Sequence, residues 1–351
     1  MPKFMGDEII TIGLSPCWDR TIEIADINWN QHKTTSSQKR APAGKALNIN
    51  KALAWMEIES TAAGLWGSED FSQMKQALTC HSRSLCHSRE SGNPRINIRL
   101  TKVPGSTREN ITIIDTANKR QMHLRSKSTL ANGKTTKLLE RDLQKIIIKH
   151  SICIFSGAMP DEAIELVEFA KKKAVSVIVD TSGPVLKRIV AKGGLFLIKP
   201  NIEELGELVG KKIKNEERAI ISAAKKLLTK VKFILVSRGE KGAMLIFSHS
   251  SGEFIPEHCK GVPQKILKAE TIVLSAKYIG KKYDVYNTVG CGDYLLAGFI
   301  SRFCPCIDNC IRALKDGVQA ATAKAFGLNE TLSWQQIQKK INIKILHLRK
   351  T

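Results

Sequence analysis

The sequence contains few aromatic residues, fewer acidic than basic residues, and no long apolar run. Phe, Trp and Tyr make up 6% of its 351 residues, and no stretch approaches the ~20 apolar residues of a membrane span. The N-terminus lacks the basic start and the long apolar stretch of a secretory signal. We therefore expect a cytoplasmic protein with no membrane partner, and its 42% hydrophobic content is ample for a buried core.

The nine cysteines are odd in number and irregularly spaced, so without an export signal we expect reduced thiols. Cys304, Cys306 and Cys310 lie close together but have no clear fourth ligand. Two Cys-His pairs, at residues 80–81 and 86–87, also suggest zinc, yet ligands so close in sequence seldom fit one tetrahedron. We therefore predict no metal site at the cysteines.

The charge is strongly positive, because 55 Lys and Arg residues against 33 Asp and Glu residues give +22. Such a charge favours an anionic partner, which could be nucleic acid, an anionic membrane or phosphorylated metabolites. The lysines are scattered through helix-like segments, and no basic patch is interleaved with aromatic residues. This distribution favours a solvated surface over a dedicated nucleic-acid interface.

From residue 151 onward, strand-like apolar runs alternate with amphipathic, helix-like stretches. "SICIFSG" precedes "DEAIELVEFAKKKA", and "LFLIKPN" precedes "IEELGELVG". Repeated strand–helix units predict an α/β fold with a mainly parallel sheet covered on both faces. Such sheets bind ligands at the carboxyl ends of their strands.

The N-terminal part is less regular. "RINIRL" and "ENITIID" alternate as half-exposed strands do, and we expect a small β-sheet lid with strands within about residues 18–40 and 95–126. Residues 80–94 contain a repeated Cys-His-Ser-Arg and show no helical or strand period, which suggests an inserted loop. We interpret residues 257–280 as a second insertion and residues 1–351 as a single domain.

The stretch "NTVGCGDYLLAGF" places an acid next to two glycines, directly before an apolar, helix-like run. A helix beginning near Gly290 would turn the N–H groups of Gly290, Cys291 and Gly292 outward, where they could bind an anion. Asp293 could then be a general base toward a hydroxyl that attacks a phosphate, or merely a first-turn aspartate that favours the helix dipole. Other phosphate signatures fail: the turn lacks the third Rossmann glycine, and "STLANGKTT" lacks the first Walker glycine.

The whole pattern of motifs resembles the phosphofructokinase B family of ribokinase-like sugar kinases, and in particular its fructose-1-phosphate and tagatose-6-phosphate kinases. The resemblance covers nearly the whole chain. It rests on "SPCWDR", "APAGKALNIN", "GSTREN", "FSGAMP", "IVDTSGPVLK", "LIKPNIEEL", "VSRGEKGAML" and "NTVGCGDYLLAGF", in this order. It implies a ribokinase-like three-layer αβα fold with a β-sheet lid, and an ATP-dependent, magnesium-requiring kinase.

For the chemistry, the resemblance assigns the role of catalytic base to Asp293. The turn of Gly290, Cys291 and Gly292 would hold the transferring phosphoryl group on backbone N–H groups. Cys291 replaces the family's usual alanine, but its peptide N–H still serves. Tyr294 is bulkier than the residue usual at that position and could crowd either substrate.

The implied sugar-binding residues are Asp19, Gly44, Lys45, Asn48 and Arg108. An Asp19 carboxylate can hold sugar hydroxyls, and Gly44 permits close backbone approach while Lys45 and Asn48 offer donors. Arg108 is the candidate for gripping a phosphate already on the sugar, because a guanidinium fits phosphate oxygens bidentately. Without the resemblance, Asp19 would be interpreted as a turn aspartate, Lys45 as an exposed lysine and Arg108 as a surface arginine.

For the nucleotide, "KPNIEEL" resembles the family's Asn-x-x-Glu motif, which implies Asn201 and Glu204 near magnesium and phosphate, with Lys199 close by. Glu204 would act through water, because Mg²⁺ keeps several of its waters. On its own, Asn201 would be a helix cap. "SRGEKG" matches the family's adenosine-side loop through Ser237, Gly239 and Gly242.

We therefore expect an ATP-dependent kinase that converts a ketohexose phosphate to a bisphosphate. The leading candidate substrate is fructose 1-phosphate. Two alternatives stay open: a ribokinase-like kinase for an unphosphorylated sugar or nucleoside, and a catalytically weak remnant whose basic surface binds RNA or DNA. Family relatives often pair through their lid strands, so we also expect a homodimer through the lid.

Overall fold

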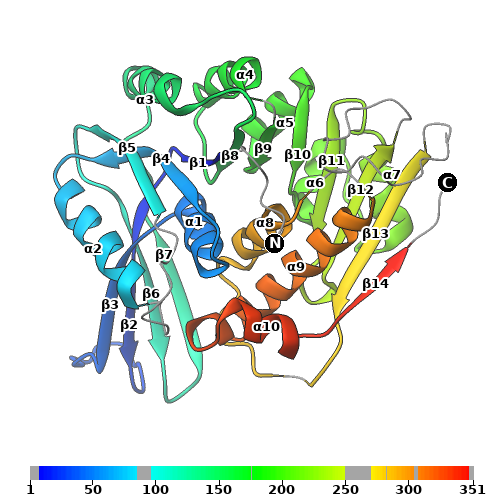
Figure 1. Cartoon of the computed structure of the whole chain (residues 1–351). Helices are drawn as coiled ribbons and strands as arrows, with labels where there is room; N and C mark the ends of the chain where they lie inside the picture. Colours follow the sequence, from blue (N-terminus) through cyan, green and yellow to red (C-terminus); the bar gives the residue numbers. More distant parts are fainter. Residues whose placement is uncertain are drawn as a thin grey trace.

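The computed structural model describes residues 8–84, 96–174, 176–249, 270–281, 283–303 and 307–347. Its largest element is a ten-stranded sheet in the order β14-β13-β12-β11-β10-β9-β8-β1-β4-β5 (Figure 1). The strands from β11 to β5 in this order pair in parallel, whereas β12, β13 and β14 add antiparallel pairs at the other edge. The predicted α/β fold with a mainly parallel sheet is confirmed.

The bounds of the sheet follow the apolar runs of the sequence. The strands are β1 (Ile9–Gly13), β4 (Ser60–Gly67), β5 (Ile96–Val103), β8 (Ile152–Ser156), β9 (Ser176–Asp180), β10 (Leu195–Ile198), β11 (Val231–Ser237), β12 (Ala243–His249), β13 (Glu270–Tyr278) and β14 (Ile343–His347). Four of them, β1, β4, β8 and β9, are buried along almost their whole length. Strands buried on both faces need helices on both sides.

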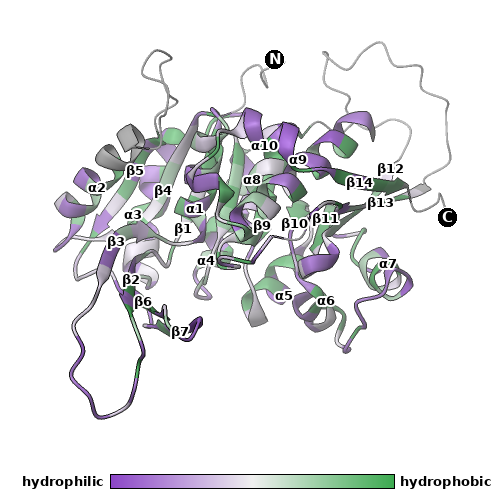
Figure 2. Cartoon of the chain, turned by 90° about the horizontal axis from the view of Figure 1, so that it is seen from below, coloured by the Kyte–Doolittle hydropathy of each residue, from purple (hydrophilic) through white to green (hydrophobic). Residues whose placement is uncertain are grey.

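Helices cover both faces of the sheet, as Figure 2 shows. Strand residues such as Ile10 and Phe155 pack against one group of helices, and Ile9 and Ile154 pack against the other. The first group is α3 (Gly133–Ile146), α4 (Ala163–Lys173), α5 (Gly183–Lys192), α6 (Ile202–Val209) and α7 (Glu217–Lys225). The second is α1 (Lys45–Trp55), α8 (Cys291–Ser301), α9 (Ile307–Ala325) and α10 (Trp334–Lys340). None of the helices in the described ranges could cross a membrane.

A small four-stranded sheet, in the order β3-β2-β6-β7, lies at the lower left of Figure 1. Its strands are β2 (Cys17–Ile24), β3 (Ser37–Ala43), β6 (Glu109–Asp115) and β7 (Arg120–Arg125). We call this sheet the lid. Its strands fall in the expected parts of the sequence with one correction, because β5 pairs with β4 in the main sheet. The alternating pattern of β5 is that of an edge strand, whose inner residues pack near α2 (Phe71–Ser84).

Both expected insertions need correction. The helix α2 continues to Ser84, so the first residues of segment 80–94 are helical, and residues 85–94 lie outside the described part. In the second segment, residues 270–278 form β13, because their apolar side chains are buried between β12 and β14. The side chains of both Cys-His pairs, and Cys304 and Cys306, lie outside the description.

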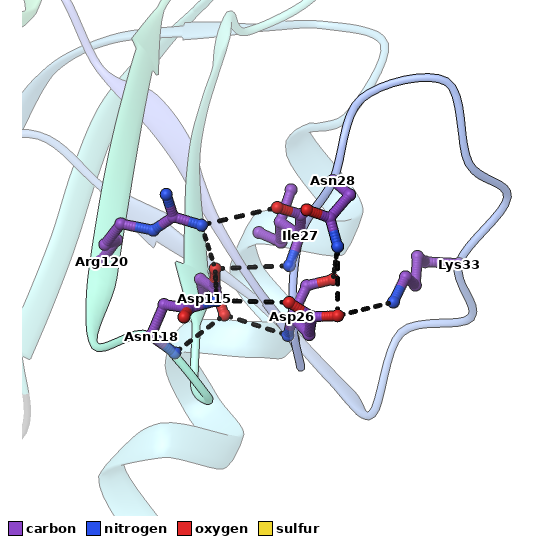
Figure 3. Close-up of polar contacts among 7 residues, drawn as sticks. All are labelled: Asp26, Ile27, Asn28, Lys33, Asp115, Asn118 and Arg120. Carbon is purple, nitrogen blue, oxygen red and sulfur yellow. Dashed lines mark hydrogen bonds and ion pairs between the residues drawn. The ribbon is translucent and has the colours of Figure 1, made fainter.

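The far end of the lid is held together by the carboxylate of Asp115 (Figure 3). It accepts the backbone N–H groups of Asp26 at 3.0 Å and Ile27 at 3.3 Å. It also accepts two N–H groups of Asn118 and forms a 2.9 Å ion pair with Arg120. Burial opposes ionisation, but the hydrogen bonds from Arg120 and Asn118 hold the pKa of Asp115 below its ordinary value. This carboxylate therefore joins the β2–β3 connection to the β6–β7 turn.

Candidate active site

The turn that precedes α8 has the geometry of an anion-binding helix start. Gly290 caps the helix with φ 83°, in the left-handed region that favours glycine. The N–H of Cys291 donates to the carbonyl of Thr288 at 3.3 Å, whereas those of Gly290 and Gly292 have no partner in the described structure. The predicted cradle thus offers two open N–H groups instead of three.

Asp293 lies in the first turn of α8 and is only 3% exposed. The side-chain amide of Asn48, in α1, donates to its Oδ2 atom at 2.9 Å. Burial and then the negative charge of Asp180 raise the pKa of Asp293 to about 7, although Lys45, Asn48 and Lys199 oppose this rise. A carboxylate with a pKa near neutrality is suited to general-base catalysis.

Asp180, at the end of β9, lies beside these groups, although the sequence motifs did not single it out. Its Oδ1 atom is 3.5 Å from the Nζ of Lys45 and 3.2 Å from the Nζ of Lys199. The hydroxyl of Ser156 donates to its other oxygen at 3.2 Å. Burial would raise the pKa of Asp180, but the two ammonium groups and the hydrogen bonds lower it below its ordinary value. Asp180 therefore remains an anion that fixes both lysines.

The start of α1 brings two predicted residues to the same place. Gly44 caps α1 with φ 121°, and a Cβ atom there would lie 3.3 Å from the Cα of Pro16. Lys45 follows, and a small pocket is lined by Gly44, Lys45, Ser15 and Ser156. The charge of Asp180 raises the pKa of Lys45 against the effect of burial. Lys45 is therefore a fixed cation at this site.

On the lid, Asn110 bridges Asp19 and Arg108. It belongs to the motif "GSTREN", but the resemblance assigns it no role. The amide of Asn110 donates to Asp19 Oδ1 at 3.0 Å, and its oxygen accepts from Arg108 at 3.2 Å. Arg108 also donates to three backbone carbonyls, those of Ser15, Pro16 and Ser126. These bonds tie the lid to the loop after β1.

Lys199 connects the turn to the nucleotide-side motif. A Cβ atom on Gly292 would lie 3.1 Å from its Nζ atom, so this ammonium lies against the turn. Two residues further on, Asn201 caps α6: its oxygen accepts the N–H of Glu204 at 2.8 Å, and Glu204 accepts the N–H of Asn201 at 2.9 Å. The simpler interpretation of Asn201 as a cap thus describes its contacts in this structure.

The remaining predicted nucleotide residues lie at the end of β11. Ser237 is the last residue of that strand, and Gly239 begins a short 3₁₀ turn. Gly242 has φ 82°, and any side chain there would collide with the carbonyl of Ala276. The geometry explains why glycine occupies this position. It shows no contact between these residues and Asp293.

Magnesium is expected from the resemblance, and the residues present fit a loosely held ion. Within the described ranges, no three His, Cys, Asp or Glu side chains gather as a metal cluster. A kinase holds Mg²⁺ largely through substrate phosphates and one or two carboxylates. Glu204 uses its Oε2 atom in the helix cap and keeps Oε1 for such a contact. Its charge contributes to the raised pKa of Lys45, which places it near the same cluster.

The unusual residues of the turn are accommodated without entering the site. Tyr294 is 9% exposed, packs against Trp55 and accepts a hydrogen bond from Asn329 at 3.2 Å. The side chain is therefore part of the core in this geometry, and its hydroxyl is buried. The thiol of Cys291 points to the carbonyl of Asn287 at 3.7 Å.

The chain is similar to several known sugar-phosphate kinases. Tagatose-6-phosphate kinase of Staphylococcus epidermidis is 22% identical over 334 residues, covering 93% of each chain. 1-Phosphofructokinase of Bacillus subtilis is 26% identical over 332 residues, which covers 91% of this chain and 92% of the relative. Two structures of Escherichia coli phosphofructokinase-2, one with fructose-6-phosphate and one a tetrameric inhibited form, superpose with TM-scores of 0.74 and 0.73. Both are 19% identical, and each alignment covers 95% of this chain and 99% of the other.

These structures share the fold of this chain, and the ribokinase-like architecture implied by the motifs is confirmed. The model of the pfkB family of carbohydrate kinases matches residues 13–262, which is most of the chain. A carbohydrate kinase transfers a phosphoryl group to a sugar hydroxyl, and the buried Asp293 at a helix start fits that chemistry. The chain therefore belongs to the pfkB family of carbohydrate kinases.

Proposed function

We propose that this protein is an ATP-dependent kinase of sugar phosphates, with fructose 1-phosphate as the first candidate substrate and fructose 1,6-bisphosphate as its product. The observation that carries the proposal is Asp293, a buried carboxylate with a pKa of about 7 at the start of α8. The names of two relatives, 1-phosphofructokinase and tagatose-6-phosphate kinase, support a phosphorylated sugar as the acceptor. We propose the cytoplasm as its compartment.

In the proposed reaction, the sugar hydroxyl lies near Asp293 and its oxygen attacks the γ-phosphorus of ATP. Asp293 takes the hydroxyl proton as the new P–O bond forms, and the bond to the β-phosphate oxygen breaks to release ADP. The open N–H groups of Gly290 and Gly292 would stabilise the charge on the transferring group. Magnesium, when bound near Glu204, would neutralise phosphate charge.

Lys199, held by Asp180, would act on the nucleotide side, and Lys45, held by the same carboxylate, remains the proposed donor to the sugar or its phosphate. Lys199 lies against Gly292, and Lys45 shares the carboxylate of Asp180 with it, so the two ammonium groups lie close together. Asp180 holds both at 3.2–3.5 Å, which reduces their freedom before substrates arrive. Preorganised charge of this kind stabilises a transition state at no further cost in reorganisation. Ser237, Gly239 and Gly242 remain the proposed adenosine-side contacts.

On the sugar side, we propose that Asp19 and Asn48 hold the hydroxyls and that Gly44 permits close approach. Arg108 is proposed to contact the phosphate already on the sugar. A guanidinium has five N–H groups, and four hydrogen bonds of Arg108 go to protein oxygens. One N–H remains for a ligand, so the contact would be a single hydrogen bond and not a fork.

An assay of ADP release tests the function directly. The intact chain would be given ATP, Mg²⁺ and, in separate reactions, fructose 1-phosphate, tagatose 6-phosphate, fructose 6-phosphate, fructose, ribose and a nucleoside. We expect the highest kcat/KM for a ketohexose phosphate. A preference for an unphosphorylated sugar or nucleoside would support the alternative kinase. No turnover with any acceptor would support the catalytically weak remnant, and a gel-shift assay at several salt concentrations would then test whether the protein binds RNA or DNA.

We also propose that the chain forms a homodimer through the outer face of the lid. Strand alternation puts Asp19 and Asn110 on one face and Ile22, Ile111 and Ile113 on the other. The neighbouring strand adds Met122 and Leu124, which are 49% and 48% exposed. A tetrameric form of the E. coli relative supports assembly in this family. Light scattering of Leu124→Asp should show a monomer, whereas Lys137→Glu on α3 should leave the dimer intact.

A further inference from the structure

Asn110 stands between two lid residues of opposite charge, Asp19 and Arg108. Its Nδ2 atom donates to the Oδ1 atom of Asp19 at 3.0 Å, and its own Oδ1 atom accepts from Arg108 at 3.2 Å. The sheet explains this placement, because Asn110 in β6 is the direct partner of Asp19 in the neighbouring strand β2. Among the described residues, Asp19 and Arg108 form no ion pair with each other.

Position 110 suits an amide because its two neighbours have opposite hydrogen-bonding requirements. A guanidinium has only donors and an ionised carboxylate has only acceptors, whereas a carboxamide has both. The oxygen of Asn110 therefore faces Arg108, and its nitrogen faces Asp19. A leucine of similar size would bond to neither neighbour, and an ionised aspartate would bond only to Arg108.

The thiol of Cys17 joins this contact from the same strand as Asp19. Its Sγ atom donates to the Oδ1 atom of Asp19 at 3.3 Å and lies 3.1 Å from the Nδ2 atom of Asn110. Burial and then the charge of Asp19 raise the pKa of Cys17 to about 12, so the thiol keeps its proton. Both donors meet the same carboxylate oxygen, and among the described residues none donates to the Oδ2 atom of Asp19.

We propose that Asn110 is a positioning residue that keeps Asp19 and Arg108 apart, so that the carboxylate can bind a sugar hydroxyl and the guanidinium a phosphate of the same substrate. The inference rests on the proposed function and deepens it. In direct contact the two charged groups would pair, because a guanidinium fits a carboxylate bidentately. The neutral amide takes one hydrogen bond from Arg108 and gives one to Asp19. One oxygen of Asp19 and one N–H group of Arg108 are thereby left for the substrate.

The simpler role for Asn110 is structural, which is to satisfy the polar groups of its neighbours on the lid. Loss of a structural residue lowers the Tm, and its effect on sugar-phosphate affinity does not depend on whether Asp19 and Arg108 are present. A positioning residue acts through those two side chains, so its effect disappears when either is removed. A double-mutant cycle separates the two roles.

The cycle uses Asn110→Leu, which removes both hydrogen bonds at similar volume, in the wild type and in the Asp19→Ala and Arg108→Ala backgrounds. Calorimetry without ATP gives the Kd of the sugar phosphate for which the wild type has the highest kcat/KM. We expect Asn110→Leu to raise this Kd about tenfold in the wild type, because Asp19 and Arg108 then neutralise each other. In either alanine background, the further change should be less than about twofold.

Asn110→Asp is the second variant, because it keeps a polar side chain of the same shape if the leucine variant does not fold. Its carboxylate would pair with Arg108 and repel Asp19, so the Kd of the sugar phosphate should again rise about tenfold, while the KM of ATP changes less than about twofold. Asn28→Asp is the matched control. Asn28 also donates to a lid carboxylate, that of Asp26 at 3.1 Å, but at the outer end of the lid.

The control should bind the sugar phosphate as the wild type does. Unchanged affinity in both variants at position 110 would overturn the positioning role, and so would an equal loss in all three backgrounds of the cycle. A wild type that binds no sugar phosphate and phosphorylates only unphosphorylated sugars would refute the proposed function instead, whatever the variants do.

Discussion

The amide nitrogen of Asn48 lies 2.9 Å from the Oδ2 atom of Asp293, although 245 residues separate them in the chain. This hydrogen bond stabilises the ionised carboxylate, whereas Asp180 favours the protonated form. Burial raises the pKa of Asp293, the charge of Asp180 adds to that rise and the hydrogen bond from Asn48 opposes it, and each of these two neighbours can be changed separately.

Asp293→Asn should lower kcat by ~10²–10⁴-fold, because it removes the base and keeps the shape of the turn. The affinities for ATP and the sugar phosphate should stay within a few-fold of the wild type. Steady-state kinetics and calorimetry provide both numbers. A variant that retains more than about a tenth of the wild-type rate would remove Asp293 from the role of base.

The rate should rise with pH through the pKa of Asp293, which is about 7. A base must be deprotonated to accept the hydroxyl proton, so activity falls below this pKa and reaches a plateau above it. In Asn48→Ala, loss of the hydrogen bond removes support for the ionised form, so the midpoint of the acid limb should move to higher pH. Profiles of log kcat/KM with the same substrate cancel the ionisation of the substrate itself. If the midpoint of the acid limb is the same in Asn48→Ala as in the wild type, the hydrogen bond from Asn48 does not support the ionised form of Asp293.

Asp180→Asn should move the midpoint of the acid limb of the pH profile to lower pH. Removal of a negative charge near Asp293 makes its ionisation easier, so its pKa falls and activity extends to lower pH. The rate on the plateau should also fall, because Lys45 and Lys199 lose the carboxylate that fixes them. Asn48→Ala is the comparison variant, because both substitutions change a neighbour of Asp293 but are expected to shift its pKa in opposite directions. Shifts of the same sign would show that general disruption, and not charge, moves the limb.

Arg108→Ala should raise the KM for a sugar phosphate about tenfold and leave the KM for ATP nearly unchanged, as expected for one hydrogen bond to a charged group. It should also lower the Tm, because Ser15, Pro16 and Ser126 lose a donor that ties the lid to the body. Kinetics and thermal unfolding separate the two effects. Equal changes in both KM values would place Arg108 outside the phosphate pocket.

The parts of the fold that were predictable carry a local signal. The strand β10 is apolar over its whole length, and β8 and β9 are apolar except at their ends. The residues that form the turn at Gly290 are adjacent in the sequence. By contrast, β5 shows the alternation of a half-exposed strand, which an edge strand of the main sheet and a lid strand share. No property of those eight residues decides which partner they pair with.

The candidate site divides in the same way. Asp293 and Asn48 stand in recognisable motifs, and the structure brings them together. Asp180 is a single aspartate at the end of β9. Its partners are Lys45, at the start of α1, and Lys199, directly after β10, so only the folded chain reveals the cluster.

The carboxylate of Asp115 has a consequence for how the lid meets a substrate (Figure 3). Because it bonds Asp26, Ile27, Asn118 and Arg120 at once, the outer end of the lid is ordered when the chain folds. That segment therefore loses its conformational entropy when the chain folds. Ligand binding does not have to order it, so this loss does not weaken binding. In the proposed reaction, a sugar bound beneath the lid would therefore not have to order this outer end.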